Sequence, residues 1–123
     1  MPLHHQLVDV GASFVASTTT TPTSYRLFAL PGTVPPKPGL VRVADGEGAP
    51  IEVEVYRVSH EGFGRFVAGV PAPMCIGTVE LVDRSVPGFL CEPRALQGAE
   101  DITSYGGWRA YMSRPGVDVR PEG

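Results

Sequence analysis

Apolar residues near the amino terminus recur at helical spacing, behind a proline at the second position. The residues that set this spacing are Leu3, Leu7, Val10, Phe14 and Val15. Apolar side chains three or four residues apart fall on one face of a helix. We therefore expect an amphipathic helix or helical loop over residues 3–16. The serine- and threonine-rich residues 17–23 predict a solvated connection after it.

Strand-like runs occupy much of the remaining chain, and glycine or proline bounds most of them. The predicted strands cover residues 25–30, 39–44, 51–55, 76–82 and 86–91. A proline-rich loop over residues 31–38 separates the first two, and a turn at 83–85 makes the last two a hairpin. Ser59 is a suitable N-cap for a helix that ends before Pro71. Short helical segments are expected over residues 93–98 and 105–113.

About five strands with two or three helices predict an α+β fold, a small mixed β-barrel with packed helices. The chain has 123 residues, enough for one domain with a real core. We place the domain at residues 1–114 and expect a flexible tail over residues 115–123. No internal repeat and no second domain are expected.

Charge and composition exclude several classes of protein. The net charge of −3 and the sequence pI near 5.5 give no support for binding nucleic acid or an anionic membrane surface. No apolar run approaches the roughly 20 residues of a membrane span, and no secretory signal is evident. Cys75 and Cys91 stand in apolar, strand-like surroundings, so we expect buried free thiols. A cytoplasmic protein is the expectation.

The dipeptide His4-His5, followed by Gln6, is the densest polar cluster. Imidazole is well suited to proton transfer near neutral pH, but two histidines near an amino terminus can also be merely exposed. The chain has three histidines, so a three-histidine zinc site would need His60 as well. We expect no metal and no cofactor, because glycine-rich phosphate loops and paired Cys-x-x-Cys motifs are also missing.

Lys37 is the only lysine, and it stands between prolines in the sequence Pro-Pro-Lys-Pro-Gly. It is either a fixed point charge for an anionic ligand or a solvated loop lysine. Glu80 lies between two apolar neighbours and faces either solvent or a pocket. Tyr25, at the entry of the first predicted strand, could hydrogen-bond a ligand at the rim of that pocket.

Nearly the whole chain resembles the C-terminal domain of allophanate hydrolase, a module with a γ-glutamyl cyclotransferase-like fold. The resemblance begins with Met1-Pro2-Leu3-His4-His5-Gln6-Leu7 and continues through Tyr25 to Val43. It goes on through segments 51–55, 64–67 and 70–81, then 88–93, 98–103 and 106–111. His5 and Gln6 fit the family pattern, whereas the family commonly has asparagine in place of His4.

The resemblance implies a role in the urea pathway. The family domain is assigned decarboxylation of N-carboxycarbamate and a contribution to assembly, while a separate amidase domain, which nothing here resembles, releases ammonia. Decarboxylation would need a bound anion, here at Lys37, and a proton for the leaving nitrogen, here from His5 or His4. The residues implied around the ligand are Gln6, Leu7, Tyr25, Lys37, Pro38, Gly39 and Glu80.

Two departures from the family pattern stand out. Family members carry a short apolar strand before the Pro-Leu loop, whereas this chain begins at Met1-Pro2-Leu3; either the strand is missing or the true start lies upstream. The related cyclotransferases use a glutamate where residues 70–73 read Val-Pro-Ala-Pro. We therefore do not expect cyclotransferase activity.

Two hypotheses follow from the sequence. In the first, the chain binds a small N-carboxylated compound and can decarboxylate it. In the second, it is a non-catalytic module that forms a homodimer or docks onto a separately encoded amidase. A polar pocket containing Lys37 and His5 would favour the first hypothesis. A broad exposed apolar face around Trp108 and Phe89 would favour the second.

Overall fold

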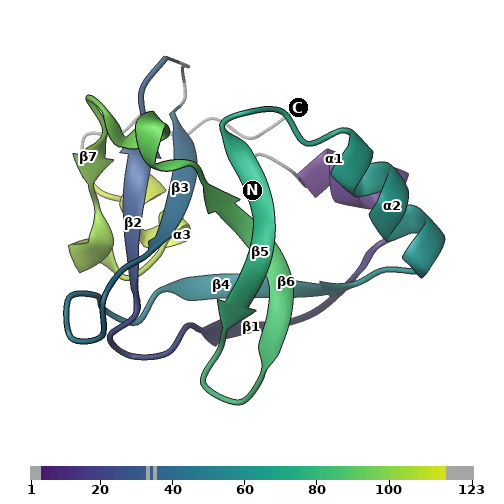
Figure 1. Cartoon of the computed structure of the whole chain (residues 1–123), viewed down its shortest axis with the longest axis horizontal. Coiled ribbons are helices and arrows are strands. Elements are labelled where there is room, and N and C mark those ends of the chain that lie inside the picture. Colours follow the sequence, from purple (N-terminus) through teal and green to yellow (C-terminus); the bar gives the residue numbers. More distant parts are fainter. Residues whose placement is uncertain (1–3, 33, 35, 116–123) are drawn as a thin grey trace.

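The computed structural model of the chain describes residues 4–32, 34 and 36–115, with only the backbone for His4, His5 and Gln6 (Figure 1). The helices are α1 (His4–Asp9), α2 (His60–Ala68) and α3 (Trp108–Met112), with 3-10 turns η1 (Pro93–Leu96) and η2 (Thr103–Tyr105). The strands are β1 (Ser13–Thr19), β2 (Tyr25–Leu30), β3 (Lys37–Arg42), β4 (Glu52–Arg57), β5 (Met74–Glu80), β6 (Ser85–Cys91) and β7 (Glu100–Asp101).

The strands form three small antiparallel sheets with the orders β1-β4, β3-β2-β7 and β5-β6. The bridge between Thr20 and Leu81 connects the end of β1 to the hairpin of β5 and β6, and a parallel bridge joins Glu52 to Gly107. An α+β domain is therefore confirmed. The predicted small mixed β-barrel is not confirmed, because the described strands form separate sheets joined by these bridges and no closed barrel.

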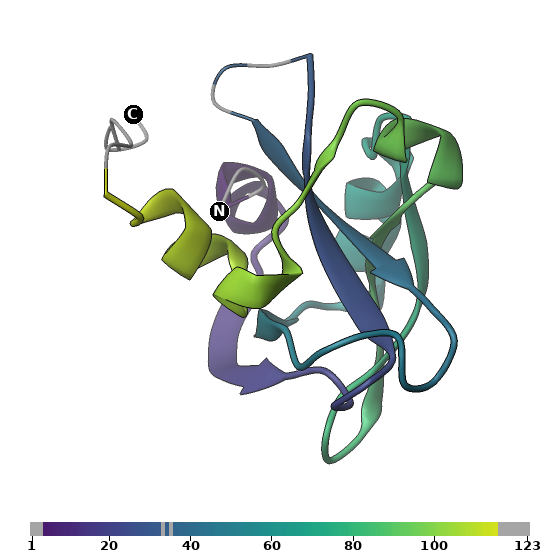
Figure 2. The same cartoon turned by 90° about the vertical axis from the view of Figure 1, so that its left-hand side faces the viewer.

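Strand β2 runs through the centre of the core. Its residues alternate in burial at first, and Tyr25 is fully buried. The cluster around it contains Tyr25, Leu27, Ala29, Leu40, Ile51, Val79, Leu81, Ile102 and Tyr111. Figure 2 shows β2 crossing the molecule with β3 at one side and the yellow-green helix α3 nearby. The core is therefore assembled from segments far apart in the sequence.

The prediction of a helix or helical loop over residues 3–16 was wrong beyond Asp9. Helix α1 ends at Asp9, and residues 13–19 form strand β1 paired with β4, with Phe14 opposite Tyr56. Thr20, expected in a solvated connection, is fully buried, and its Oγ1 accepts a hydrogen bond from the Ile51 N–H at 3.0 Å. Phe14 and Val15 fit a helical spacing, but aromatic and β-branched residues favour strands when a partner strand is available.

The other predicted elements are close to the observed ones. The Ser59 side chain caps α2 by accepting a hydrogen bond from the Gly62 N–H at 3.0 Å. Strands β5 and β6 form the expected hairpin, with Glu80 opposite Ser85. Strand β3 begins at Lys37, two residues earlier than predicted. The predicted tail lies, apart from Pro115, outside the described residues.

The two thiols differ in their surroundings. Both cysteines are free, as predicted. Cys91 is buried, and burial raises the pKa of its thiol, with the nearby Cys75 adding to the effect. Cys75 is exposed, which corrects the expectation that both are buried. Cys75 lies opposite Leu90 in the hairpin, and Cys91 is the next residue along β6. Because adjacent residues of a strand point to opposite faces, the two thiols lie on opposite faces of the hairpin.

Candidate functional site

A cavity of about 250 Å³ lies beside Lys37, where β2 ends and β3 begins. Lys37 is the first residue of β3 and lies opposite Leu30, the last residue of β2. The connection between α2 and β5 supplies one wall, and η1 supplies another. The lining residues are Leu30, Pro31, Lys37, Pro71, Ala72, Pro73, Met74 and Ala95.

Lys37 is the charged group of this pocket. Its side chain is exposed, and within the described part of the chain no carboxylate forms an ion pair with it. An ammonium group at the mouth of a cavity attracts an anion and offers three hydrogen-bond donors. The other seven lining residues are apolar. The arrangement therefore provides one positive charge beside an apolar chamber.

The local sequence explains how Lys37 reaches this position. Strand β3 lies at the edge of its sheet, where proline is tolerated, and Pro38 lies opposite Ala29. At Gly39 a Cβ atom would come within 2.8 Å of Leu30 Cδ2 and 2.9 Å of Cys91 Sγ. Gly39 thus allows β3 to pack closely against Leu30 and Cys91. Pro38 and Gly39 position Lys37 but do not line the cavity.

The histidine cluster lies on α1. His4, His5 and Gln6 form its first turn, and their side chains are outside the described residues. Leu7 is half-buried, and its carbonyl accepts a hydrogen bond from the Ala12 N–H at 3.0 Å, which ends the helix in a turn. The roles assigned to His4, His5 and Gln6 remain predictions.

Tyr25 and Glu80 lie together, but not at the Lys37 pocket. The Tyr25 hydroxyl accepts a hydrogen bond from the Glu80 N–H at 2.9 Å. The Glu80 carboxylate forms an ion pair with Arg42, whose guanidinium carbon lies 5.8 Å from the centre of the Tyr25 ring. Neither residue lines the cavity beside Lys37. In the structure they connect β2 and β3 to β5.

Sequence reasoning missed the far walls of the pocket. The sequence pattern assigned Pro71 and Pro73 to the end of a helix, and Ala95 to a short helical segment. A second proline-rich stretch, similar in composition to residues 31–38, was the available signal. Only the packing of the α2–β5 connection brings the two stretches to the same cavity.

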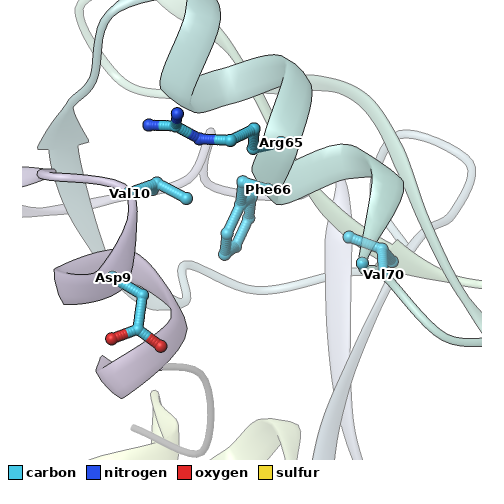
Figure 3. A pocket seen from close by; sticks show the side chains of 6 residues that line it. Asp9, Val10, Arg65, Phe66 and Val70 are labelled. Carbon is cyan, nitrogen blue, oxygen red and sulfur yellow. The ribbon is translucent and has the colours of Figure 1, made fainter.

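A second, smaller cavity of about 170 Å³ lies between α1 and α2 (Figure 3). Val10, Phe66 and Val70 form its apolar part, and Asp9 and Arg65 lie at its edges. The Phe66 ring packs edge-on against Phe89, with 5.1 Å between ring centres. Arg65 is paired with Glu61 at 3.2 Å. Because this arginine already has a carboxylate partner, we regard the Lys37 pocket as the better anion site.

The residues that the structure describes contain no group of three or more His, Cys, Asp and Glu side chains that could hold a metal ion. Among the helices that the structure describes, none has the length and apolar character to cross a membrane.

Sequence comparisons connect the chain to two yeast enzymes. It is 49% identical over 116 residues to the urea amidolyase of Saccharomyces cerevisiae and 44% identical over 116 residues to that of Lachancea kluyveri. Each alignment covers 91% of this chain and 6% of the relative. The chain thus spans a small fraction of the curated relatives it matches.

Solved structures show the same relationship. The allophanate hydrolase of Kluyveromyces lactis superposes with a TM-score of 0.84 at 44% identity, over 92% of this chain and 19% of its own. The urea amidolyase of K. lactis gives 0.84 at 45% identity, over 91% of this chain and 7% of its own. A protein specific to uropathogenic E. coli superposes with a TM-score of 0.79 at 30% identity. This superposition covers 91% of this chain and 85% of the E. coli protein.

The family described as allophanate hydrolase C-terminal domain matches residues 1–113. This match spans nearly all of the described chain and agrees with the identities and superpositions above. The chain therefore belongs to the allophanate hydrolase C-terminal domain family.

Proposed function

We propose that this chain binds a short N-carboxylated compound of the urea pathway in the pocket beside Lys37. The observation that carries the proposal is an exposed lysine, Lys37, in the lining of a cavity of about 250 Å³. The family relationship to allophanate hydrolase and urea amidolyase supports the chemical class of the ligand. The size of the cavity suits a compound of a few heavy atoms beside an ammonium group.

The catalytic part of the proposal is decarboxylation of that compound. Lys37 holds a carboxylate, and His5, with His4 as the second candidate, gives a proton to the nitrogen that carries it. The carbon–nitrogen bond then breaks, its electron pair stays with the protonated nitrogen, and carbon dioxide leaves. A positioned proton donor typically accelerates such a step by about 10²- to 10⁴-fold. Because N-carboxylates already decompose in water, a simple site is sufficient.

Ligand-dependent thermal unfolding tests the binding step. A ligand that binds only the native state raises the melting temperature, by an amount equivalent to about 2.7 kcal/mol at 100 times Kd. We expect malonate or malonamate to stabilise the wild-type chain and not Lys37→Ala. Arg84→Ala is the matched control, because it removes one exposed positive charge from the hairpin turn, away from the pocket. No stabilisation by either compound would exclude the proposed site.

A second measurement tests the catalytic step in chains that bind the ligand. Release of carbon dioxide from an N-carboxylated compound should fall in His5→Gln, with binding at Lys37 unchanged. A wild-type chain that binds the compound but does not accelerate its decay beyond the rate in buffer would limit the function to binding.

A docking function is the second candidate, and exposed apolar residues favour it. Trp108 and Phe89 are half-buried, so the face expected around them is not broadly exposed. The exposed large apolar side chains include Phe14 (55%) and Val15 (40%) on β1, and Val8 (58%) on α1. Strand β1 has no charged residue, and among the described strands it shares a sheet only with β4. At its end, the Thr19 carbonyl also accepts a hydrogen bond from the Val82 N–H. Such a strand edge can accept another protein segment.

Sedimentation velocity tests this second function. The chain would be mixed with the remainder of the K. lactis allophanate hydrolase, produced without the region that this chain matches. Docking predicts a complex that Phe14→Glu abolishes and that Val34→Glu, a fully exposed position in the connection between β2 and β3, leaves intact. A homodimer would sediment as such without the second protein. If the chain sediments as a monomer in both experiments, docking is excluded.

A further inference from the structure

We infer that Arg94 is a second anion-binding residue of the Lys37 pocket and binds the carboxylate of a two-ended ligand that Lys37 does not reach. This assignment rests on the proposed function and adds a specificity-determining residue to the site. The lining of the cavity itself supplies one positive charge, that of Lys37. Arg94 supplies another from η1, where it directly precedes the lining residue Ala95.

The backbone around Arg94 is attached to the walls of the pocket. The Glu92 N–H donates a hydrogen bond to the Pro73 carbonyl at 2.8 Å, and the Ala95 N–H donates to the Glu92 carbonyl at 2.9 Å. Pro73 and Ala95 both line the cavity. Arg94 therefore lies in a short turn that is bonded to one wall and leads into another, and its long side chain begins one residue from the lining.

Within the described residues, Glu92 is the ion-pair partner of Arg94. The Nε and Nη2 atoms of Arg94 both lie 3.1 Å from the same carboxylate oxygen of Glu92. The two side chains are 68% and 45% exposed, and an ion pair this exposed contributes little to stability. A ligand carboxylate can therefore replace Glu92 at small cost. The planar guanidinium then offers it a pair of N–H donors in a matching geometry.

The other arginines of the pocket-forming strands are engaged elsewhere. Arg26 and Arg42 lie at the opposite end of β2 and β3 and pair with carboxylates there. Apart from Lys37 the lining is apolar, and a second carboxylate placed against it without a cation would lose its hydration at high cost. Arg94 is thus the residue that determines whether the pocket accepts a compound with a carboxylate at each end.

Malonate and malonamate separate the second charge from the rest of the ligand, since they differ by one amide in place of one carboxylate. Isothermal titration of the full chain slightly above neutral pH compares them. Arg94→Gln should weaken malonate binding by about tenfold, as expected for one charge-assisted contact, and malonamate binding by less than about twofold. Arg94→Lys should keep most of the malonate affinity because it keeps the charge. Lys37→Ala should weaken the binding of both compounds.

Two further variants control for general electrostatics. Glu92→Gln should raise the affinity for malonate, because it removes the carboxylate that competes for Arg94. Arg84→Gln removes one exposed positive charge from the β5–β6 turn and should leave both affinities unchanged. If Arg94→Gln weakens malonate and malonamate equally, or weakens neither, the role of Arg94 is overturned, and the proposed function stands as long as Lys37 is still required. Absence of binding by either compound in the wild-type chain would overturn both.

Discussion

The two ends of strand β2 have opposite roles. At its first residue, Tyr25 is fully buried, and its hydroxyl accepts a hydrogen bond from the Glu80 N–H. At its last residue, Leu30 is also buried, but it forms part of the lining of the cavity beside Lys37. One strand therefore connects the closed core to the candidate site.

Polar groups have different roles at the two ends of β2. Around Tyr25 the polar groups hold strands together: Thr103 Oγ1 accepts from the Leu27 N–H at 2.9 Å, and Arg26 pairs with Asp101 at 2.8 Å. Beside Leu30 the ammonium of Lys37 has no such partner among the described residues. Substitutions at the closed end should therefore change stability, and those at the open end should change binding.

Tyr25→Ala should have the largest effect on stability. Removing a fully buried aromatic side chain typically costs about 3–5 kcal/mol of unfolding free energy. Tyr25→Phe should cost less, about 1–3 kcal/mol, because the ring is kept while the partly buried Glu80 N–H loses its acceptor. Urea unfolding measures both values. A Tyr25→Phe variant as stable as the wild type would mean that the hydroxyl contributes nothing to this end of the strand.

Thr103→Val should have the next largest effect. The side chains have nearly the same shape, but valine leaves the buried Leu27 N–H without its acceptor. Leaving a buried donor unpaired costs about 1–3 kcal/mol. Ser104→Ala is the control, because Ser104 is the exposed neighbour in the same turn. Equal unfolding midpoints for the two variants would contradict the proposed importance of this bond.

The sequence predicted the elements whose signals are local. The limits of β2, the Ser59 cap of α2 and the β5–β6 hairpin follow from strand patterns, a capping residue and a turn. Strand β1 could not be predicted in this way. Phe14 and Val15 also fit a helix, and the pairing of Phe14 with Tyr56 joins distant parts of the chain. The burial of Thr20 follows from that same distant pairing.

The sequence predicted only part of the candidate site, because the remaining lining residues come from distant parts of the chain. Lys37 was identified from its unique position between prolines, and the structure places it at a cavity. Ala95 and the segment 71–74 were not assigned to the site, because only tertiary packing brings them to the cavity wall. Tyr25 was assigned to the pocket rim from its place in the sequence, and the register of β2 places it at the other end of the strand.

Asp101 gives a smaller effect that depends on pH. Partial burial alone would raise the pKa of Asp101, but hydrogen bonds from Thr103 and Arg26 outweigh it and lower that pKa below its usual value. Its contribution to stability is therefore complete above the unfolded-state pKa, about 3.9, and disappears as the pH falls through the lower folded-state pKa. The carboxylate is partly exposed, so we expect Asp101→Asn to cost at most about 1 kcal/mol at neutral pH.

Urea unfolding at neutral pH and near pH 3 measures this dependence. The difference between wild type and Asp101→Asn should shrink at the lower pH. Asp101 binds a proton first in the unfolded chain and, at still lower pH, in the folded one, so the ionised carboxylate progressively loses its advantage over the neutral amide. A difference that is the same at both pH values would show that ionisation of Asp101 does not stabilise the connection between β2 and β7.

Ala95→Leu should have the smallest effect on stability and the clearest effect on the open end of β2. Ala95 is half-buried at the wall of the cavity, so we expect a change in unfolding free energy within about 0.5 kcal/mol. The larger side chain should occupy space that the ligand needs and weaken the binding of malonamate. Ala68→Leu, at the exposed last residue of α2, is the matched control. Titration of malonamate into both variants shows whether the ligand enters the cavity. Unchanged binding in Ala95→Leu would mean that the ligand stays outside and pairs with Lys37 at the surface alone.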